Sequence, residues 1–126
     1  MKRFETMRSA TAQREQAPDG SRVFPLLSMP VGGMALFELG RNQVSRAVRH
    51  RTVNELWLVL EGRGSMWRKQ DGCEEVAPLE EGVCVSIPAG TAFQFRCDGS
   101  DGLRVVAVTM PPWPGDEEAE LVPGKW

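Results

Sequence analysis

The chain has 126 residues, of which 41% are hydrophobic and 25% charged, and its formal net charge is −2. This length fits one domain with one hydrophobic core. The balanced charge gives no signal for nucleic-acid binding, and no apolar run reaches the roughly 18–20 residues that span a bilayer. We therefore expect a single globular domain with neither a nucleic acid nor a membrane as partner.

The chain contains an odd number of cysteines without Cys-x-x-Cys spacing, namely Cys73, Cys84 and Cys97. Such usage is typical of free thiols in a reducing compartment. We expect three reduced thiols and a cytoplasmic protein. Cys84 and Cys97 fall in predicted strands, where we expect them to be buried and inert.

Residues 1–20 are polar, show no apolar period and end in the turn signal Pro18-Asp19-Gly20. This composition predicts a flexible N-terminal arm. At the other end, residues 111–126 are rich in proline, which central strands exclude. We predict a C-terminal tail that packs on the domain and is anchored by Trp113 and Trp126.

Between these ends, residues 21–110 show short apolar or alternating runs, each closed by Gly, Pro, Asn or Asp. Turn signals about every 8–12 residues are typical of an all-β sandwich or barrel. Asp71-Gly72 is a strong hairpin signal, because Gly tolerates the positive φ of a tight turn. The predicted strands are Val23–Leu27, Met34–Leu39, Leu56–Leu60, Ser65–Arg68, Glu74–Ala77, Val83–Ile87, Ala92–Cys97 and Leu103–Thr109.

Two spaced motifs carry most of the information. They are Val48-x-His50-x(4)-Glu55-x(6)-Gly62 and Gly82-x(5)-Pro88-x-Gly90-x(2)-Phe93. Both resemble the signature motifs of the cupin superfamily, in particular of small single-domain cupins, over roughly residues 34–110. The resemblance implies an all-β fold, a cupin-type antiparallel β-barrel or jelly roll (a double-stranded β-helix).

The metal motif of this resemblance is degenerate. Cupins hold a metal with two His and a Glu from the first motif and a His from the second. Here Val48 replaces the first His and Phe93 the last, and hydrocarbon side chains cannot coordinate a metal. The resemblance thus implies no tightly bound cofactor. A divalent transition metal at low occupancy would use His50 and Glu55, with Gln94 as a third ligand if a bulge turned it inward.

Strand alternation predicts which side chains face the barrel interior. His50, the only histidine, and Glu55 would form a catalytic acid/base pair, or a hydrogen-bonded relic of a lost site. The candidate ligand-binding residues on the same faces are Arg46, Val48, Trp57, Phe93 and Phe95.

Each of these candidates has a competing explanation. Arg46 would clamp a carboxylate or phosphate, or be an ordinary surface arginine. Phe93 and Phe95 would line an aromatic pocket, or simply pack in the core.

Because both faces of the strand after Glu55 are apolar, we expect it to be buried on both sides, with Leu56, Leu58 and Leu60 against a second layer.

Three functions stay open on these residues. The favoured one is a small cupin that binds an organic small molecule in an aromatic-lined barrel pocket without a tightly bound metal. The second is a metal-dependent enzyme of the dioxygenase, isomerase or decarboxylase type using His50 and Glu55. The third is an interaction module with a filled barrel. The sequence does not decide whether the protein is an enzyme.

We expect a homodimer, because apolar runs in residues 21–39 would be exposed at a lone barrel edge.

Overall fold

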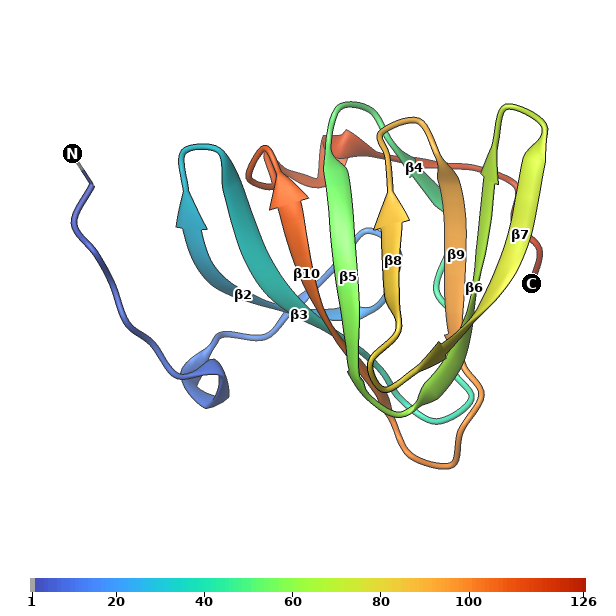
Figure 1. Ribbon diagram of the computed structural model, residues 1–126, viewed down its shortest axis with the longest axis horizontal. Coiled ribbons are helices and arrows are strands. Elements are labelled where there is room, and N and C mark those ends of the chain that lie inside the picture. The colour runs from blue at the N-terminus through green and yellow to red at the C-terminus, as the bar shows by residue number, and fades with distance from the viewer. Residues whose placement is uncertain (1) are drawn as a thin grey trace.

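The computed structural model describes residues 2–126 as two antiparallel sheets that face each other (Figure 1). One sheet has six strands in the order β1-β2-β3-β10-β5-β8, and the other has five in the order β11-β4-β9-β6-β7. The prediction of an all-β jelly roll is confirmed. Among the described residues the only helical segments are two 3₁₀ turns, η1 (Ser9–Thr11) and η2 (Asp116–Glu118). The strands are β1 (Glu15–Gln16), β2 (Arg22–Met29), β3 (Gly32–Leu39), β4 (Val48–His50), β5 (Asn54–Glu61), β6 (Arg63–Gln70), β7 (Cys73–Glu80), β8 (Cys84–Ile87), β9 (Ala92–Cys97), β10 (Leu103–Met110) and β11 (Ala119–Leu121).

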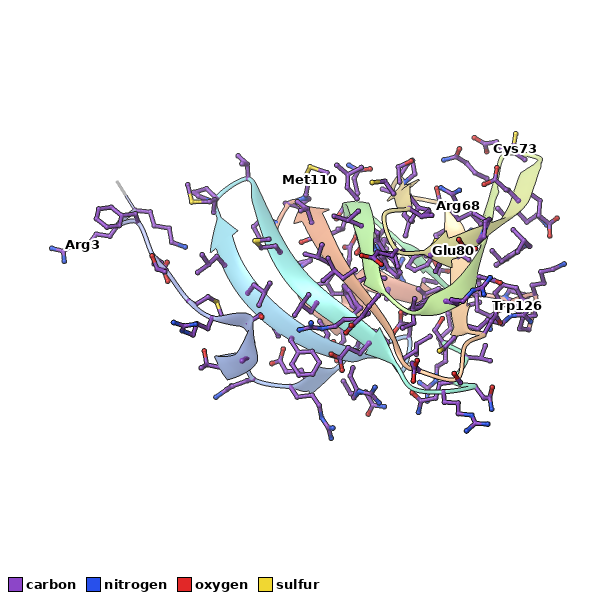
Figure 2. The ribbon with its side chains drawn as sticks, turned by 60° about the horizontal axis from the view of Figure 1, so that its bottom comes forward. Arg3, Arg68, Cys73, Glu80, Met110 and Trp126 are labelled. Carbon is purple, nitrogen blue, oxygen red and sulfur yellow. The ribbon has the colours of Figure 1, made fainter. Side chains whose placement is uncertain are left out.

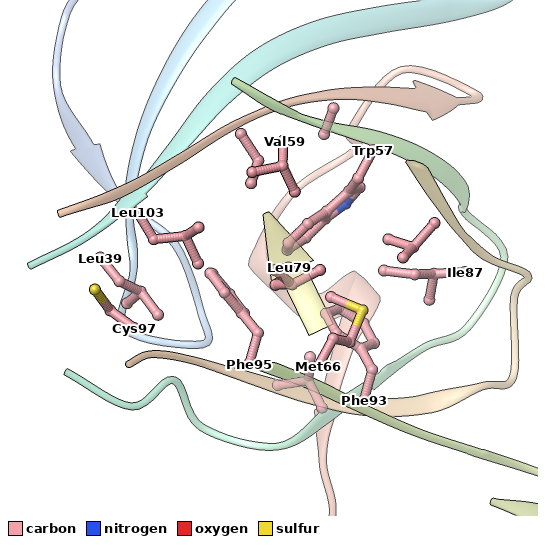
Figure 3. Packing of buried hydrophobic residues seen from close by; sticks show 14 residues of the cluster. Leu39, Trp57, Val59, Met66, Leu79, Ile87, Phe93, Phe95, Cys97 and Leu103 are labelled. Carbon is pink, nitrogen blue, oxygen red and sulfur yellow. The ribbon is translucent and has the colours of Figure 1, made fainter. Parts of the chain in front are cut away.

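The core fills the space between the sheets at one end of the barrel. Figure 3 shows Phe95 from β9 and Met66 from β6 projecting toward residues of the opposite sheet. Both are fully buried, because alternate side chains of each strand point inward. The other labelled residues are Leu39, Trp57, Val59, Leu79, Ile87, Phe93, Cys97 and Leu103.

Tight turns hold the strands in register. Asp71 and Gly72 both have positive φ, 42° and 81°, as the predicted two-residue hairpin requires. The turn aligns Gln70 with Cys73 at the end of the β6–β7 pair. At Gly62, φ is +92°, and a Cβ would collide with the backbone carbonyl of Gly102, so only glycine fits there.

The outer face of the six-stranded sheet differs from the expectation. Leu56 and Leu58 on β5 were expected to pack against a second layer, but they are 52% and 39% exposed. The reason is that only the inward face of β5 meets the opposite sheet. Cys84, expected to be buried, is also exposed, because it shares the outward parity of Ser86 on β8, while Cys97 is buried.

Both ends of the chain contribute to the barrel. Residues 15–20 were expected within the flexible arm, yet Glu15–Gln16 pair with β2 and Asp19 is 6% exposed. The tail supplies β11, which pairs with β4. Figure 2 shows Trp126 against the barrel, far from Arg3 at the other end of the molecule.

Gln94 joins this tail to the sheet. Its side-chain Nε2 donates to the carbonyl of Trp126, and its Oε1 accepts the backbone N–H groups of Lys125 and Trp126. The guanidinium of Arg96 lies 4.1 Å from the ring centroid of Trp126. Amide hydrogen bonds and cation–π stacking therefore fix the chain end on the outer face of β9.

Candidate functional site

A cavity of about 400 Å³ lies between the two sheets, so the interior of the barrel is not filled. Four kinds of segment surround it: strands of the six-stranded sheet, β4 and β9 of the other sheet, residues 15–19, and the tail before β11. The volume is within the range of small-molecule sites. The lining includes Asp19, Phe37, Val48, His50, Glu55, Trp57, Phe93, Thr109, Trp113 and Asp116.

His50 and Glu55 meet in this cavity, as the motif predicted. Their side chains are 5% and 2% exposed, and Nδ1 of His50 lies 3.0 Å from Oε2 of Glu55. The two atoms are at ion-pair distance but are not aligned for a hydrogen bond, so within residues 2–126 Nδ1 has no hydrogen-bond partner. The other carboxylate oxygen, Oε1, accepts a 3.0 Å bond from Nε1 of Trp57. Glu55 therefore contacts both its ring neighbours through separate oxygens.

Aromatic rings surround the imidazole. Phe93 and Trp113 meet the His50 ring edge-on, at centroid distances of 5.1 and 4.9 Å. Trp57 stacks on Phe37 at 5.6 Å and meets Phe93 at 6.2 Å. The rings hold one another in place and make most of the wall apolar.

Two of the residues at the metal-motif positions carry no donor atom for a metal. Val48 and Phe93 are directly paired across β4 and β9, line the cavity and carry no donor atom. Gln94 is wrong as a third ligand, because strand alternation turns its amide to the outer face, where the tail uses it. Across residues 2–126, no three His, Cys, Asp or Glu side chains are grouped to hold a metal.

Two of the predicted ligand-binding residues lie elsewhere. Arg46 does not share the inward face with His50; its side chain is exposed and outside the cavity wall, because regular alternation begins only at Val48. Phe95 is fully buried in the core beside Trp57 and does not reach the cavity. Val48, Trp57 and Phe93 do line it, as expected.

Asp19 is a site residue that the sequence did not reveal. Its Oδ1 accepts bonds from the hydroxyl and the backbone N–H of Ser21, at 2.6 and 2.9 Å. Burial raises the pKa of Asp19 above its ordinary value, the Ser21 bonds offset part of this, and the charge of Glu55 adds to the rise. Pro18-Asp19-Gly20 reads as a turn in the sequence, which gave no sign that its carboxylate faces the barrel.

Glu118 fixes the tail beside the site. Its carboxylate accepts backbone N–H groups of Thr52 and Val53 and the hydroxyl of Thr52. Burial alone would raise the pKa of Glu118, but these bonds, with a contribution from His50, hold it below the ordinary value. This anchor positions the segment that carries Trp113 and Asp116 over the cavity.

Comparisons with known proteins agree with this architecture. A family model described as "Cupin domain" matches residues 35–109, more than half of the chain. Among curated proteins there is no match. Among solved structures, KdgF from Halomonas sp. is similar with a TM-score of 0.75 at 14% identity, over 89% of this chain and 97% of that chain.

Two further structures extend the likeness. A point variant of Streptomyces PAC13, solved with uridine, has a TM-score of 0.74 at 13% identity, over 97% of this chain and 92% of its own. The cupin domain of Schizosaccharomyces pombe Cnp3 has a TM-score of 0.72 at 10% identity, over 86% and 75%. At these identities the likeness shows a shared fold.

Proposed function

The chain belongs to the cupin family, and on that premise we propose that it binds an organic small molecule in the cavity between its sheets, without a tightly held metal. The observation that carries the proposal is the cavity of about 400 Å³, which brings the buried His50–Glu55 pair together with the aromatic side chains of Trp57, Phe93 and Trp113. Apolar walls with a few fixed polar groups are typical of small-molecule sites.

The lining suggests a division of roles. Val48, Trp57 and Phe93 would contact the apolar part of a ligand. His50 and Glu55 would bind its polar part, and they form the candidate acid/base pair if the ligand is also transformed. The PAC13 variant solved with uridine supports an organic ligand in a barrel of this fold.

The alternative is a metal-dependent cupin enzyme that uses His50 and Glu55. A similar structure from Thermotoga maritima, with a TM-score of 0.71, is described as a predicted oxalate decarboxylase. Two protein ligands usually give weak affinity, and the apolar side chains of Val48 and Phe93 offer no polar shell to orient them.

Two measurements test the proposal against this alternative. Elemental analysis of protein purified without chelator should find well under one equivalent of transition metal. A thermal-shift screen of organic ligands should find compounds that raise the unfolding temperature. About one equivalent of metal, lost in Glu55→Ala, would replace the proposal with the metalloenzyme. A screen without any stabilising compound would count against a binding function.

We also propose a homodimer in the cytoplasm. Four exposed apolar side chains lie together on the outer face of the six-stranded sheet and form what we call the outer patch: Met34, Leu56, Leu58 and Val108. Val108 pairs with Met34 on one side and Leu56 on the other. A two-fold axis would let the patch cover its own copy.

The free cysteines suit a reducing compartment, and within residues 2–126 no helix is long and apolar enough to cross a membrane.

A further inference from the structure

The ionisable groups that line the cavity are almost all acidic. Four acidic residues line it, the buried Asp19 and Glu55 and the exposed Glu15 and Asp116, together with a single histidine, His50. Among the described residues, no lysine or arginine lines the cavity. Even with His50 protonated, the carboxylates outnumber it, so the site has the charge of an acceptor for cations.

Arginines on or beside β4 lie outside the cavity lining, and two of them contact groups of the C-terminal tail. Arg49 pairs with Glu120, and the side chain of Arg51 donates to the backbone carbonyl of Glu117. Arg46 is exposed beyond the wall. An anionic ligand would therefore meet carboxylates without a compensating cation, and its burial would be unfavourable.

Four aromatic side chains also line the cavity: Phe37, Trp57, Phe93 and Trp113. Phe37 and Trp57 stack, while Phe93 and Trp113 enclose the His50 ring. Aromatic side chains next to carboxylates are the usual means of recognising ammonium groups, because the ring face and the carboxylate both attract positive charge.

Buried polar groups point to a missing partner. Both Ser21 bonds go to Oδ1 of Asp19, so within residues 2–126 Oδ2 accepts none. Asp19 is only 6% exposed. Thr109, 7% exposed, lines the same cavity and makes no side-chain hydrogen bond to the described residues. Buried polar groups normally have partners, so a ligand in the cavity would supply one to Asp19 and one to Thr109.

We propose that the cavity binds an organic cation, a molecule with an ammonium group that lies among the aromatic rings and is balanced by Asp19 and Glu55. This inference rests on the proposed function, because it names the class of ligand that the same cavity takes. Binding would favour the ionised form of Asp19 and so oppose the burial that raises its pKa.

Isothermal titration of the full chain with three probes of similar shape tests the proposal. Choline is a permanent cation, neohexyl alcohol replaces its nitrogen with carbon, and tert-butylacetate is an anion of similar bulk. We expect choline to bind roughly tenfold more tightly than the alcohol, and the anion to bind most weakly.

Matched variants locate the preference. Asp19→Asn keeps an oxygen for Ser21 but removes the charge, so it should weaken choline binding several-fold and leave the alcohol unchanged. Asp101→Asn, at an exposed position outside the cavity, should change the affinity neither for choline nor for the alcohol. If the alcohol or the anion binds as tightly as choline, the cation proposal is overturned while small-molecule binding stands. If none of the probes binds, the cation proposal also fails, and the ligand screen decides the proposed function separately.

Discussion

The indole N–H of Trp57 donates to the carboxylate of Glu55, two residues earlier on the same inward face of β5, at 3.0 Å. The second oxygen of that carboxylate lies 3.0 Å from Nδ1 of His50. Glu55 therefore contacts both the ring that forms the cavity wall, through a hydrogen bond, and the imidazole at its polar end, at ion-pair distance. The carboxylate at this position of the motif thus contacts two rings through its two oxygens.

Replacing Glu55 should therefore lower stability as well as binding. Glu55→Ala leaves the buried N–H of Trp57 without an acceptor and should lower the free energy of unfolding by about 1–3 kcal/mol. Glu55→Gln keeps an acceptor oxygen and should lose less. Urea unfolding followed by tryptophan fluorescence measures both; equal midpoints for the parent and Glu55→Ala would contradict this role.

Asp19 should make stability depend on pH. Its folded pKa is raised above the ordinary value of 3.8, so the folded chain binds more protons than the unfolded chain between those two values. The stability that Asp19 contributes is then present at low pH and is lost as pH rises through the folded pKa. Asp19→Asn should unfold at a higher temperature than the parent at neutral pH, and the difference should vanish below about pH 4.

Glu118 should make stability depend on pH in the opposite direction. Its lowered pKa contributes stability above its ordinary value of 4.5, and that stability is lost as pH falls through the folded value. Differential scanning calorimetry across pH should therefore show the contribution of Asp19 to stability falling as pH rises, and the contribution of Glu118 falling as pH falls. If Asp19→Asn gives the same gain at every pH, burial of its charge is not the cause.

The sequence predicted most of the barrel, because Asp71-Gly72 and the alternation in strands such as β5 are local signals. It missed β1 and β11, which have only two or three residues each and depend on partners distant in the chain. Alternation also located His50, Glu55 and Trp57 correctly. It failed at Arg46, which precedes the regular strand, and at Asp19, whose burial depends on how the N-terminal segment crosses the barrel.

The outer patch should hold the dimer together. Light scattering should give twice the chain mass of 14.0 kDa at micromolar concentration. Leu56→Glu places a charge in the patch and should give a monomer, because burying an unpaired carboxylate is costly. Val76→Glu, at a 44% exposed position on β7, is the matched control and should leave the mass unchanged. A monomeric parent, or a dimeric Leu56→Glu, would rule out this interface.

Restoring the two missing ligands should create metal affinity. Val48 and Phe93 are paired residues on β4 and β9, both line the cavity, and His50 lies two residues after Val48 on the same face. Val48→His with Phe93→His would place three imidazoles and Glu55 around one point, a donor set that suits divalent transition metals.

Competition with a chromophoric chelator should show that the double variant binds zinc or cobalt far more tightly than the parent. Phe93 is 2% exposed, so its loss will lower stability, and circular dichroism must show that the barrel persists. Phe93→His alone adds only one imidazole, so its metal affinity should lie between those of the parent and the double variant. Val76→His, outside the cavity, should gain nothing. If folded Val48→His/Phe93→His binds metal no better than the parent, the side chains at these two positions are not what keeps metal from the site.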